Sequence, residues 1–445
     1  MNKSPKHLWE EKIWKLLAKQ SAPAVVWMLV MALYNFVDTV FVGRGVWTDA
    51  IAAISVVMPI QMIIWAFAMA FGIGSASIIS RKLGENDYKE VSKTFWTFQS
   101  SNLLFSIVLS ILWFIFARPL LTFFGAIPEI LEAWYEYLSI LLVWVVFFCF
   151  NMWNNNIIRS VGHAKSSMII MLSSAISNVI LDWLFIFKFK MWIAGAARAT
   201  VLSWIIGTIM VLIYYFGKNN IIKAKISDFK IKFKKLKEIL SIWISSLARQ
   251  SAASVTTILV NNLLWIYGWS LAIAAYGIIN RAVTVFFMPM FGVIQWMQPI
   301  IWYNHGAWFK QRVKKVTILA VKVLTIFTTI VFAINITMPW ILLNIFSKDV
   351  ELIALAVPAM RLMVLMFPII WFQVVASGFY QSLWRAKEAF WFAIIRQVVI
   401  LIPILMILPK FFGLNGIRYS FPLSDFLAAV IIFVVFYKDL KKCWA

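Results

Sequence analysis

Apolar residues fill long stretches from one end of the chain to the other, and polar residues collect between these stretches. Each stretch is long enough to cross about 30 Å of hydrocarbon as a helix. Helices and closed barrels are the structures that satisfy their backbone groups in lipid. The pattern therefore predicts an all-α membrane protein with twelve transmembrane helices, at residues 20–42, 51–80, 96–117, 131–158, 166–187, 194–216, 239–264, 271–301, 316–345, 352–381, 388–409 and 414–437.

The composition supports a membrane protein. Of the 445 residues, 63% are hydrophobic and 13% are charged, whereas a soluble domain is about 45–50% apolar and about 25% charged. This balance excludes most soluble enzyme classes, and we expect no enzymatic activity. The chain lacks the GxxxxGK[ST] loop that binds nucleotide phosphates, so we do not expect ATP to drive its function.

Positive charge lies mainly in one set of loops. The net charge is +23, and Lys and Arg concentrate at both termini and in alternate loops. The positive-inside rule places these parts in the cytoplasm, with membrane lipids rather than nucleic acid as partners. The most basic segment, residues 218–238, has eight lysines and is interpreted as a linker lying on anionic headgroups.

The two halves of the chain repeat at an offset of 222 residues. The segment Ala50–Ala53 matches Ala272–Ala275, and Ser160 matches Ser382. The repeat predicts two six-helix lobes, an N-lobe at 1–217 and a C-lobe at 239–445. A parallel repeat of this kind is common in transporters, whose substrate path lies between the halves.

Two acidic residues lie inside predicted spans of the first half. Asp38 lies in the first span and Asp182 in the fifth, with Asn178 one helical turn before Asp182. Ionisable residues within the membrane are expensive and mark functional sites by default. Carboxylate and amide oxygens suit a small hard cation, and buried carboxylates equally suit protons. The residues leave sodium and proton open.

The second half has other polar residues inside its predicted spans, among them Arg396 and Asp425. Interior polar residues often hold helices together, and Arg396 is a candidate partner for Asp425. His163 and His305 fall in predicted cytoplasmic loops, where we expect them to be solvated.

At these residues the chain resembles the MATE (multidrug and toxic compound extrusion) transporters, nearest the bacterial multidrug-efflux type. The stretches that carry the resemblance are Ala32–Asp38, Asn155–Gly162, Asn178–Asp182 and Gly195–Ala197. The resemblance spans nearly the whole chain and implies two six-helix lobes in the bacterial inner (plasma) membrane. It also implies a secondary-active antiporter that exports organic cations in exchange for protons or sodium.

The resemblance also implies site residues. The family's N-lobe cation site matches Asp38, Asn178, Asp182 and Thr200, which would also be the ligands of a sodium ion. The residues that it suggests for the substrate path and its gating are Pro23, Tyr34, Asn35 and Tyr137. Arg198 stands where the family often has an aromatic, and its positive charge would weaken cation binding. No cofactor is expected beyond the coupling ion, and a monomer is expected.

Tryptophan is unusually abundant, at 24 residues against 17 glycines, whereas glycine averages about 7% of residues. Across the repeat Gly43, Gly74 and Gly162 face Trp265, Trp296 and Trp384, and four more tryptophans stand where the family suggests small residues: Trp47, Trp192, Trp302 and Trp308. One interpretation is a set of interfacial aromatic belts. The other is that UGA codons, read as tryptophan in one bacterial code, specify glycine in another.

Two further functions are alternatives to multidrug antiport. The first is a flippase for a lipid-linked precursor, which would need a broad cationic cavity. The second is a binding or assembly partner whose cavity is filled by tryptophan.

Overall fold

The computed structural model describes residues 10–23, 25–26, 28, 30, 68, 72–123, 128–217, 221–222, 233–345, 349–383 and 385–444. Throughout these ranges the regular structure is helical, without strands. The predicted all-α class is therefore confirmed. The first two predicted spans, 20–42 and 51–80, lie mostly outside the described residues, so the count of twelve spans stays a prediction.

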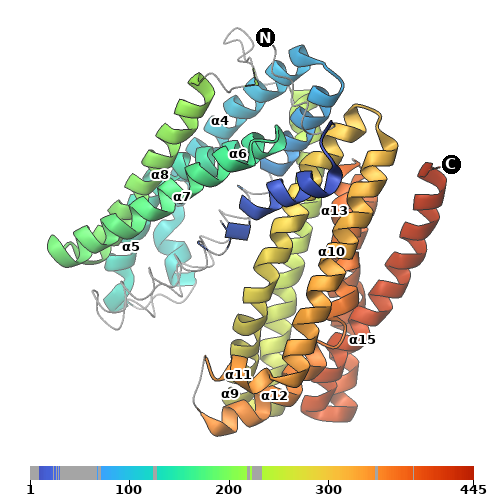
Figure 1. The fold of residues 1–445 in the computed structure, drawn as a ribbon. Helices are drawn as coiled ribbons and strands as arrows, with labels where there is room; N and C mark the ends of the chain where they lie inside the picture. The colour runs from blue at the N-terminus through green and yellow to red at the C-terminus, as the bar shows by residue number, and fades with distance from the viewer. Residues whose placement is uncertain are drawn as a thin grey trace. The chain divides into compact units, whose positions relative to one another are not determined.

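The chain divides into two compact units, one containing residues 18–243 and the other residues 244–445, with residues 12–17 counted in the second. The first unit has helical residues 72–84, then α4 (Tyr88–Phe123), α5 (Pro128–Val143), α6 (Val145–Ser160), α7 (Ala164–Asp182), the π-helix η1 (Trp183–Lys188) and α8 (Trp192–Phe216). Helix α8 packs against α5, α6 and α7, which makes it the central helix among these elements (Figure 1).

The helix α9 (Phe233–Gly306) begins in the first unit and continues into the second from residue 244. The second unit then has α10 (Lys310–Thr337), α11 (Pro339–Leu343), α12 (Val350–Met363), α13 (Phe367–Ser382), α14 (Ala386–Ile394), the π-helix η3 (Ile395–Leu401) and α15 (Ile402–Trp444). Helix α13 packs against α10 and α15, which are drawn in orange and red in Figure 1. Helix α9 begins at Phe233, inside the predicted linker, and covers two predicted spans that are separated by non-helical backbone at Trp269.

Breaks in the helices recur at equivalent positions of the two halves. A bend of 53° at Trp144 separates α5 from α6, and a bend of 55° separates α12 from α13. At the second break Pro368, near the start of α13, has no amide hydrogen to continue the preceding helix. The 222-residue offset carries Trp144 onto Met366, the residue that precedes α13. The internal repeat predicted from sequence therefore extends to backbone geometry.

Apolar side chains point outward as well as inward. On α4 the exposed fractions of Leu104, Ile111 and Ile115 are 54%, 54% and 62%. A continuous apolar face of this kind is rare on a protein in water. Five described helices are long and apolar enough to cross a membrane, or up to eight if each bent pair forms one span. The outward apolar faces are therefore the surfaces that lipid covers.

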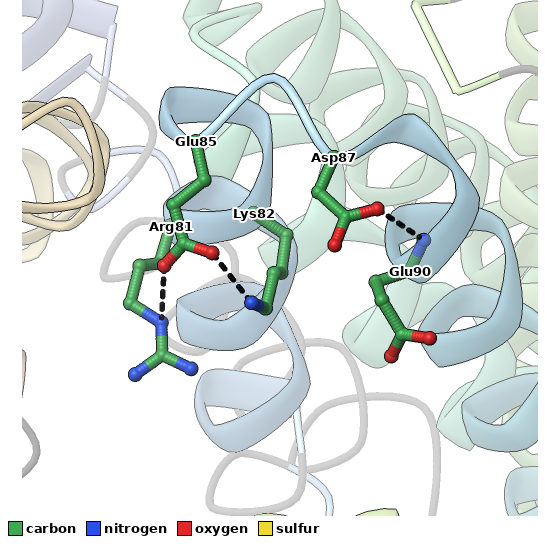
Figure 2. A network of polar contacts seen from close by, with 5 residues as sticks. All are labelled: Arg81, Lys82, Glu85, Asp87 and Glu90. Atoms are coloured by element: carbon green, nitrogen blue, oxygen red, sulfur yellow. Dashed lines mark hydrogen bonds and ion pairs between the residues drawn. The ribbon is translucent and has the colours of Figure 1, made fainter.

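The turn before α4 is held by charged side chains (Figure 2). Glu85 pairs with Arg81 and with Lys82, at 3.5 and 2.5 Å. Asp87 accepts a hydrogen bond from the backbone N–H of Glu90 at 3.1 Å, which caps the first turn of α4. These contacts thus stabilise the end of the preceding helix and the start of α4 on either side of the turn.

Candidate functional site

Small residues lie where the start of α8 approaches η1, the continuation of α7. Gly195, Ala196 and Ala197 lie in the first turns of α8, and the two alanines are buried. A Cβ built on Gly195 would lie 3.2 Å from the backbone carbonyl carbon of Phe185 in η1. Small residues permit such close approach between membrane helices. Gly195 therefore permits the close approach of α8 to η1, the continuation of α7.

Three predicted cation-site residues lie at this contact. Asn178 and Asp182 are one turn apart on α7, and each is only 1% exposed. The Asn178 side-chain amide donates to Thr200 Oγ1 of α8 at 3.4 Å, a long bond. Thr200 in turn donates to the carbonyl oxygen of Ala196 at 2.9 Å. The fold thus brings the Asn178 amide and the Thr200 hydroxyl together at the contact, with the Asp182 carboxylate one turn further along α7.

Asp182 ends α7 at the start of the π-helix η1. A π-helical turn inserts an extra residue into the helix and occurs frequently at functional sites. Within the described ranges no group of three His, Cys, Asp or Glu side chains could hold a metal ion. A cation bound at this place would therefore use amide and hydroxyl oxygens as well as carboxylate, as the donor set Asn178, Asp182 and Thr200 offers.

The remaining predicted site residues are described only in part. Tyr137 of α5 is half-buried and packs against the apolar cluster of Leu141, Ala197 and Val201, beside the first turns of α8. Pro23 is helical, as are residues 13–22 before it and residues 25–26 after it, and it is half-buried. Asp38, Tyr34 and Asn35 lie outside the described residues. Their roles stay predictions.

A buried polar layer lies on α6, where the sequence offered Asn155 as part of the family resemblance without assigning it a contact. The Asn155 side chain donates to the Ser167 carbonyl oxygen at 3.1 Å and accepts from Ser167 Oγ at 3.0 Å, which ties α6 to α7. Asn154 accepts from the Tyr215 hydroxyl of α8 at 2.8 Å and from Gln99 of α4 at 2.5 Å. The signal in the sequence was the run Asn154–Asn156, since polar residues within a span must find partners inside the protein.

His163, which we expected to be solvated, is half-buried. Its Nδ1 lies 2.6 Å from the hydroxyl of Tyr214 on α8, and its ring packs edge-on against that tyrosine. The neighbouring Arg159 bonds to Asn156 Oδ1 at the end of α6. His163 precedes α7, so the short turn between α6 and α7 leaves one side of the ring against α8.

Arg198 lines an open pocket of about 480 Å³ in the first unit. Its exposed side chain reaches toward Met191, with Nη1 4.0 Å from the sulfur. The other lining residues are apolar: Ile140, Trp144, Phe185, Phe189, Met191, Val201, Leu202 and Ile205. Arg198 is therefore the single charged side chain in this pocket's lining.

The second unit contains the ion pair that the sequence suggested. Arg396 Nε lies 2.9 Å from Asp425 Oδ1, and the Asp425 side chain is 5% exposed. Arg396 belongs to the π-helix η3, and Asp425 to α15. The Gln373 amide of α13 donates to the backbone carbonyl of Asp425 at 2.9 Å. The pairing of Arg396 with Asp425 is confirmed.

Comparison with known proteins agrees with the fold and the repeat. A family model described as MatE matches residues 23–184 and again residues 242–407, once in each half. The multidrug export protein MepA of Staphylococcus saprophyticus is 28% identical over 429 residues, covering 96% of this chain and 94% of that protein.

Two solved structures have the same fold. The crystal structure of MATE in the bent conformation superposes with a TM-score of 0.93 at 22% identity, covering 99% of this chain and 98% of that chain. The crystal structure of MATE in the straight conformation superposes with a TM-score of 0.92 at 22% identity, covering 99% of each chain. At this identity the likeness concerns the fold.

The apolar helices, the repeat and the double match agree. The protein is a multi-pass transporter of the bacterial membrane rather than an enzyme, and the chain belongs to the MATE family.

Proposed function

We propose that this transporter exports organic cations in exchange for protons or sodium by alternating access. The observation that carries the proposal is the pair of buried residues Asn178 and Asp182, with the half-buried Thr200 beside them, inside two packed, apolar helices. The name of the Staphylococcus relative, a multidrug export protein, supports the substrate class. Asp38 would complete the set from the first span.

The coupling follows from the cost of burying charge. Asp182 is 1% exposed, and an ionised carboxylate away from water is unfavourable unless a counter-charge accompanies it. A proton or a sodium ion removes that cost. The state of the protein that admits water to Asp182 holds the ion less tightly than the state that closes around Asp182. This difference in ion affinity shifts the equilibrium between the two states.

The test is transport into everted vesicles. Vesicles that carry the chain are given a fluorescent organic cation such as ethidium, under a proton gradient alone and then under a sodium gradient alone. We expect uptake under one gradient, and loss of that uptake in Asp182→Asn and in Asp38→Asn. The gradient that supports uptake identifies the coupling ion.

A matched control separates transport from folding. Asp349 is the N-cap of α12, where its side chain accepts from the N–H groups of Glu351 and Leu352. Asparagine caps helices about as well as aspartate, so Asp349→Asn makes the same chemical change and should leave transport intact. Wild-type uptake by a folded Asp182→Asn variant would refute the proposed coupling.

One observation favours the flippase alternative. Arg198 places a positive charge in an otherwise apolar pocket of about 480 Å³, a combination that suits an anionic phosphate with a hydrophobic tail. Proteoliposomes with a fluorescent lipid-linked phosphate in one leaflet test it. Lipid transfer that Arg198→Gln abolishes, together with no ethidium transport, would favour the flippase over the antiporter.

A further inference from the structure

Three tryptophans adopt backbone conformations that normally belong to glycine. The φ angles of Trp192, Trp269 and Trp308 are 50°, 57° and 61°. An L-residue at positive φ brings its Cβ too close to the backbone, and a bulky residue there is an outlier. Among the described non-glycine residues only Asn86 and Lys190 share this region, so tryptophan supplies three of five cases.

Trp308 lies at the end of α9, at a position where helices commonly have glycine. Its backbone N–H donates to the His305 carbonyl at 3.1 Å, and the next N–H donates to the Asn304 carbonyl at 2.8 Å. These two bonds define a Schellman motif at the end of α9, and Trp308 is its left-handed residue. That position is usually glycine and sometimes asparagine, because both tolerate positive φ.

The internal repeat shows what the same turn uses elsewhere. The 222-residue offset carries Trp308 onto Asn86, whose φ is 59°. There the Asn86 N–H donates to Leu83 at 3.1 Å and the next N–H donates to Lys82 at 2.9 Å. Figure 2 shows the residues on either side of this turn. The same backbone geometry thus holds an asparagine in the first half and a tryptophan in the second.

A second pair of turns gives the same contrast. Gly162 has a φ of 87°, and the next N–H donates to the Ile158 carbonyl at 3.2 Å. Its repeat mate is Trp384, which lies outside the described residues. The N–H that follows it, on Arg385, donates to the Tyr380 carbonyl at 3.1 Å, which is the equivalent bond. Tryptophan again stands opposite glycine.

Trp269 and Trp192 extend the pattern beyond helix ends of this type. Trp269 combines φ of 57° with ψ of −164°, close to a region that is essentially restricted to glycine. Trp192 begins α8 with φ of 50°. In the second half Gly413 has a φ of 54° and lies one residue before the repeat mate of Trp192. Glycine therefore supplies positive φ next to the position equivalent to Trp192.

The indole rings gain little burial in return. Trp192, Trp269 and Trp308 are 51%, 73% and 79% exposed. An interfacial aromatic belt accounts for exposed tryptophan side chains, but it does not account for positive φ angles. The belt interpretation therefore leaves the backbone unexplained, and the glycine interpretation explains both the backbone and the shortage of glycine.

We propose that Trp192, Trp269 and Trp308 occupy glycine positions, and that the cell which makes this transporter reads their codons as glycine. The codon would be UGA, which one bacterial code assigns to tryptophan and another to glycine. The repeat adds Trp384 to the same set.

The direct test is peptide mass mapping of the transporter purified from its own membranes. We expect the peptides that contain positions 192, 269, 308 and 384 to have the mass of glycine at these positions. Tryptophan masses at positions 192, 269 and 308 would overturn the proposal, as would UGG codons at those three positions in the gene.

A second test uses the chain with tryptophan at all four positions and variants of it, expressed from UGG codons in a host that reads UGG as tryptophan. Trp308→Gly and Trp308→Asn should each raise the ratio of folded to unfolded protein roughly tenfold, and Trp308→Ala should raise it less because alanine keeps its Cβ. Trp371 is the control, because it is 2% exposed inside α13 and packs against Phe287 and Phe291. Trp371→Gly should destabilise the protein. A loss of stability in Trp308→Gly as large as in this control would overturn the conformational argument.

Discussion

The ion pair between Arg396 and Asp425 allows a quantitative test of how charge is kept inside the second unit. Asp425→Asn removes the carboxylate charge and keeps the shape of the side chain. Arg396→Met removes the guanidinium and keeps most of the apolar stem. The bond from Gln373 reaches the backbone carbonyl of Asp425, so neither substitution disturbs it. The double variant has neither charge.

The expected magnitudes follow from burial within the membrane. An unpaired arginine at the centre of a spanning helix costs roughly 2.5–3.5 kcal/mol on insertion scales. In Asp425→Asn the cost is smaller, because the Arg396 side chain is 29% exposed and the asparagine oxygen can still accept a hydrogen bond from it. We therefore expect Asp425→Asn to lower the free energy of unfolding by about 2 kcal/mol. Arg396→Met leaves the more deeply buried Asp425 without its partner and should lower the free energy of unfolding by about 3 kcal/mol or more. The double variant should cost about 1 kcal/mol or less, because a neutral pair needs no counter-charge.

The assay is equilibrium unfolding in mixed micelles, followed by far-ultraviolet ellipticity and analysed as a double-mutant cycle. We expect the sum of the two single-variant losses of unfolding free energy to exceed the loss in the double variant by about 2 kcal/mol or more. Asp349→Asn, at an exposed helix cap, serves as the control with no expected change. If the two single losses simply add in the double variant, the two charges do not stabilise each other and the reasoning fails.

Three further predictions concern packing and the candidate site. Gly416→Ala should prevent stable folding, because its Cβ would lie 2.4 Å from the carbonyl oxygen of Leu408. Gly277→Ala is the control, because its Cβ would have nothing within 4 Å and should change the unfolding temperature little; equal effects of the two variants would refute the packing argument. Asn155→Leu should cost about 1–3 kcal/mol in unfolding free energy, because it leaves the polar atoms that Asn155 bonds on α7 without those partners. Thr200→Val should weaken ion-driven ethidium uptake while leaving the unfolding temperature nearly unchanged, since it removes one site oxygen but keeps the side-chain shape; full uptake would remove Thr200 from the site.

Much of the fold was predictable because lipid imposes one rule on every span. Each apolar segment from 96–117 onward has helical counterparts, because a backbone in lipid must bond within itself. What the hydropathy pattern missed were the interruptions inside segments. Nothing in composition marks Trp144 as the break between α5 and α6, and the π-helices η1 and η3 lie within continuous apolar runs.

The candidate site was predictable in part. Buried Asn178 and Asp182 could be chosen from the sequence because polar residues one turn apart inside a span share a face. Their relation to Thr200 needed the structure, because it depends on how α8 packs against α7. The environment of His163 needed the structure for the same reason, since its position in a short turn does not say which helix packs beside it.

The sequence by itself determined that this chain lies in a membrane, that its helices follow one another in a repeated order, and which residues in its spans are polar. These properties depend on local composition and spacing, and each segment meets the hydrocarbon independently. The tertiary structure decided which polar groups meet, as in the pairs of Asn178 with Thr200 and Arg396 with Asp425. It also decided which residues take positive φ. Both depend on where distant segments pack and how helices end, and neither is a property of a single stretch of chain.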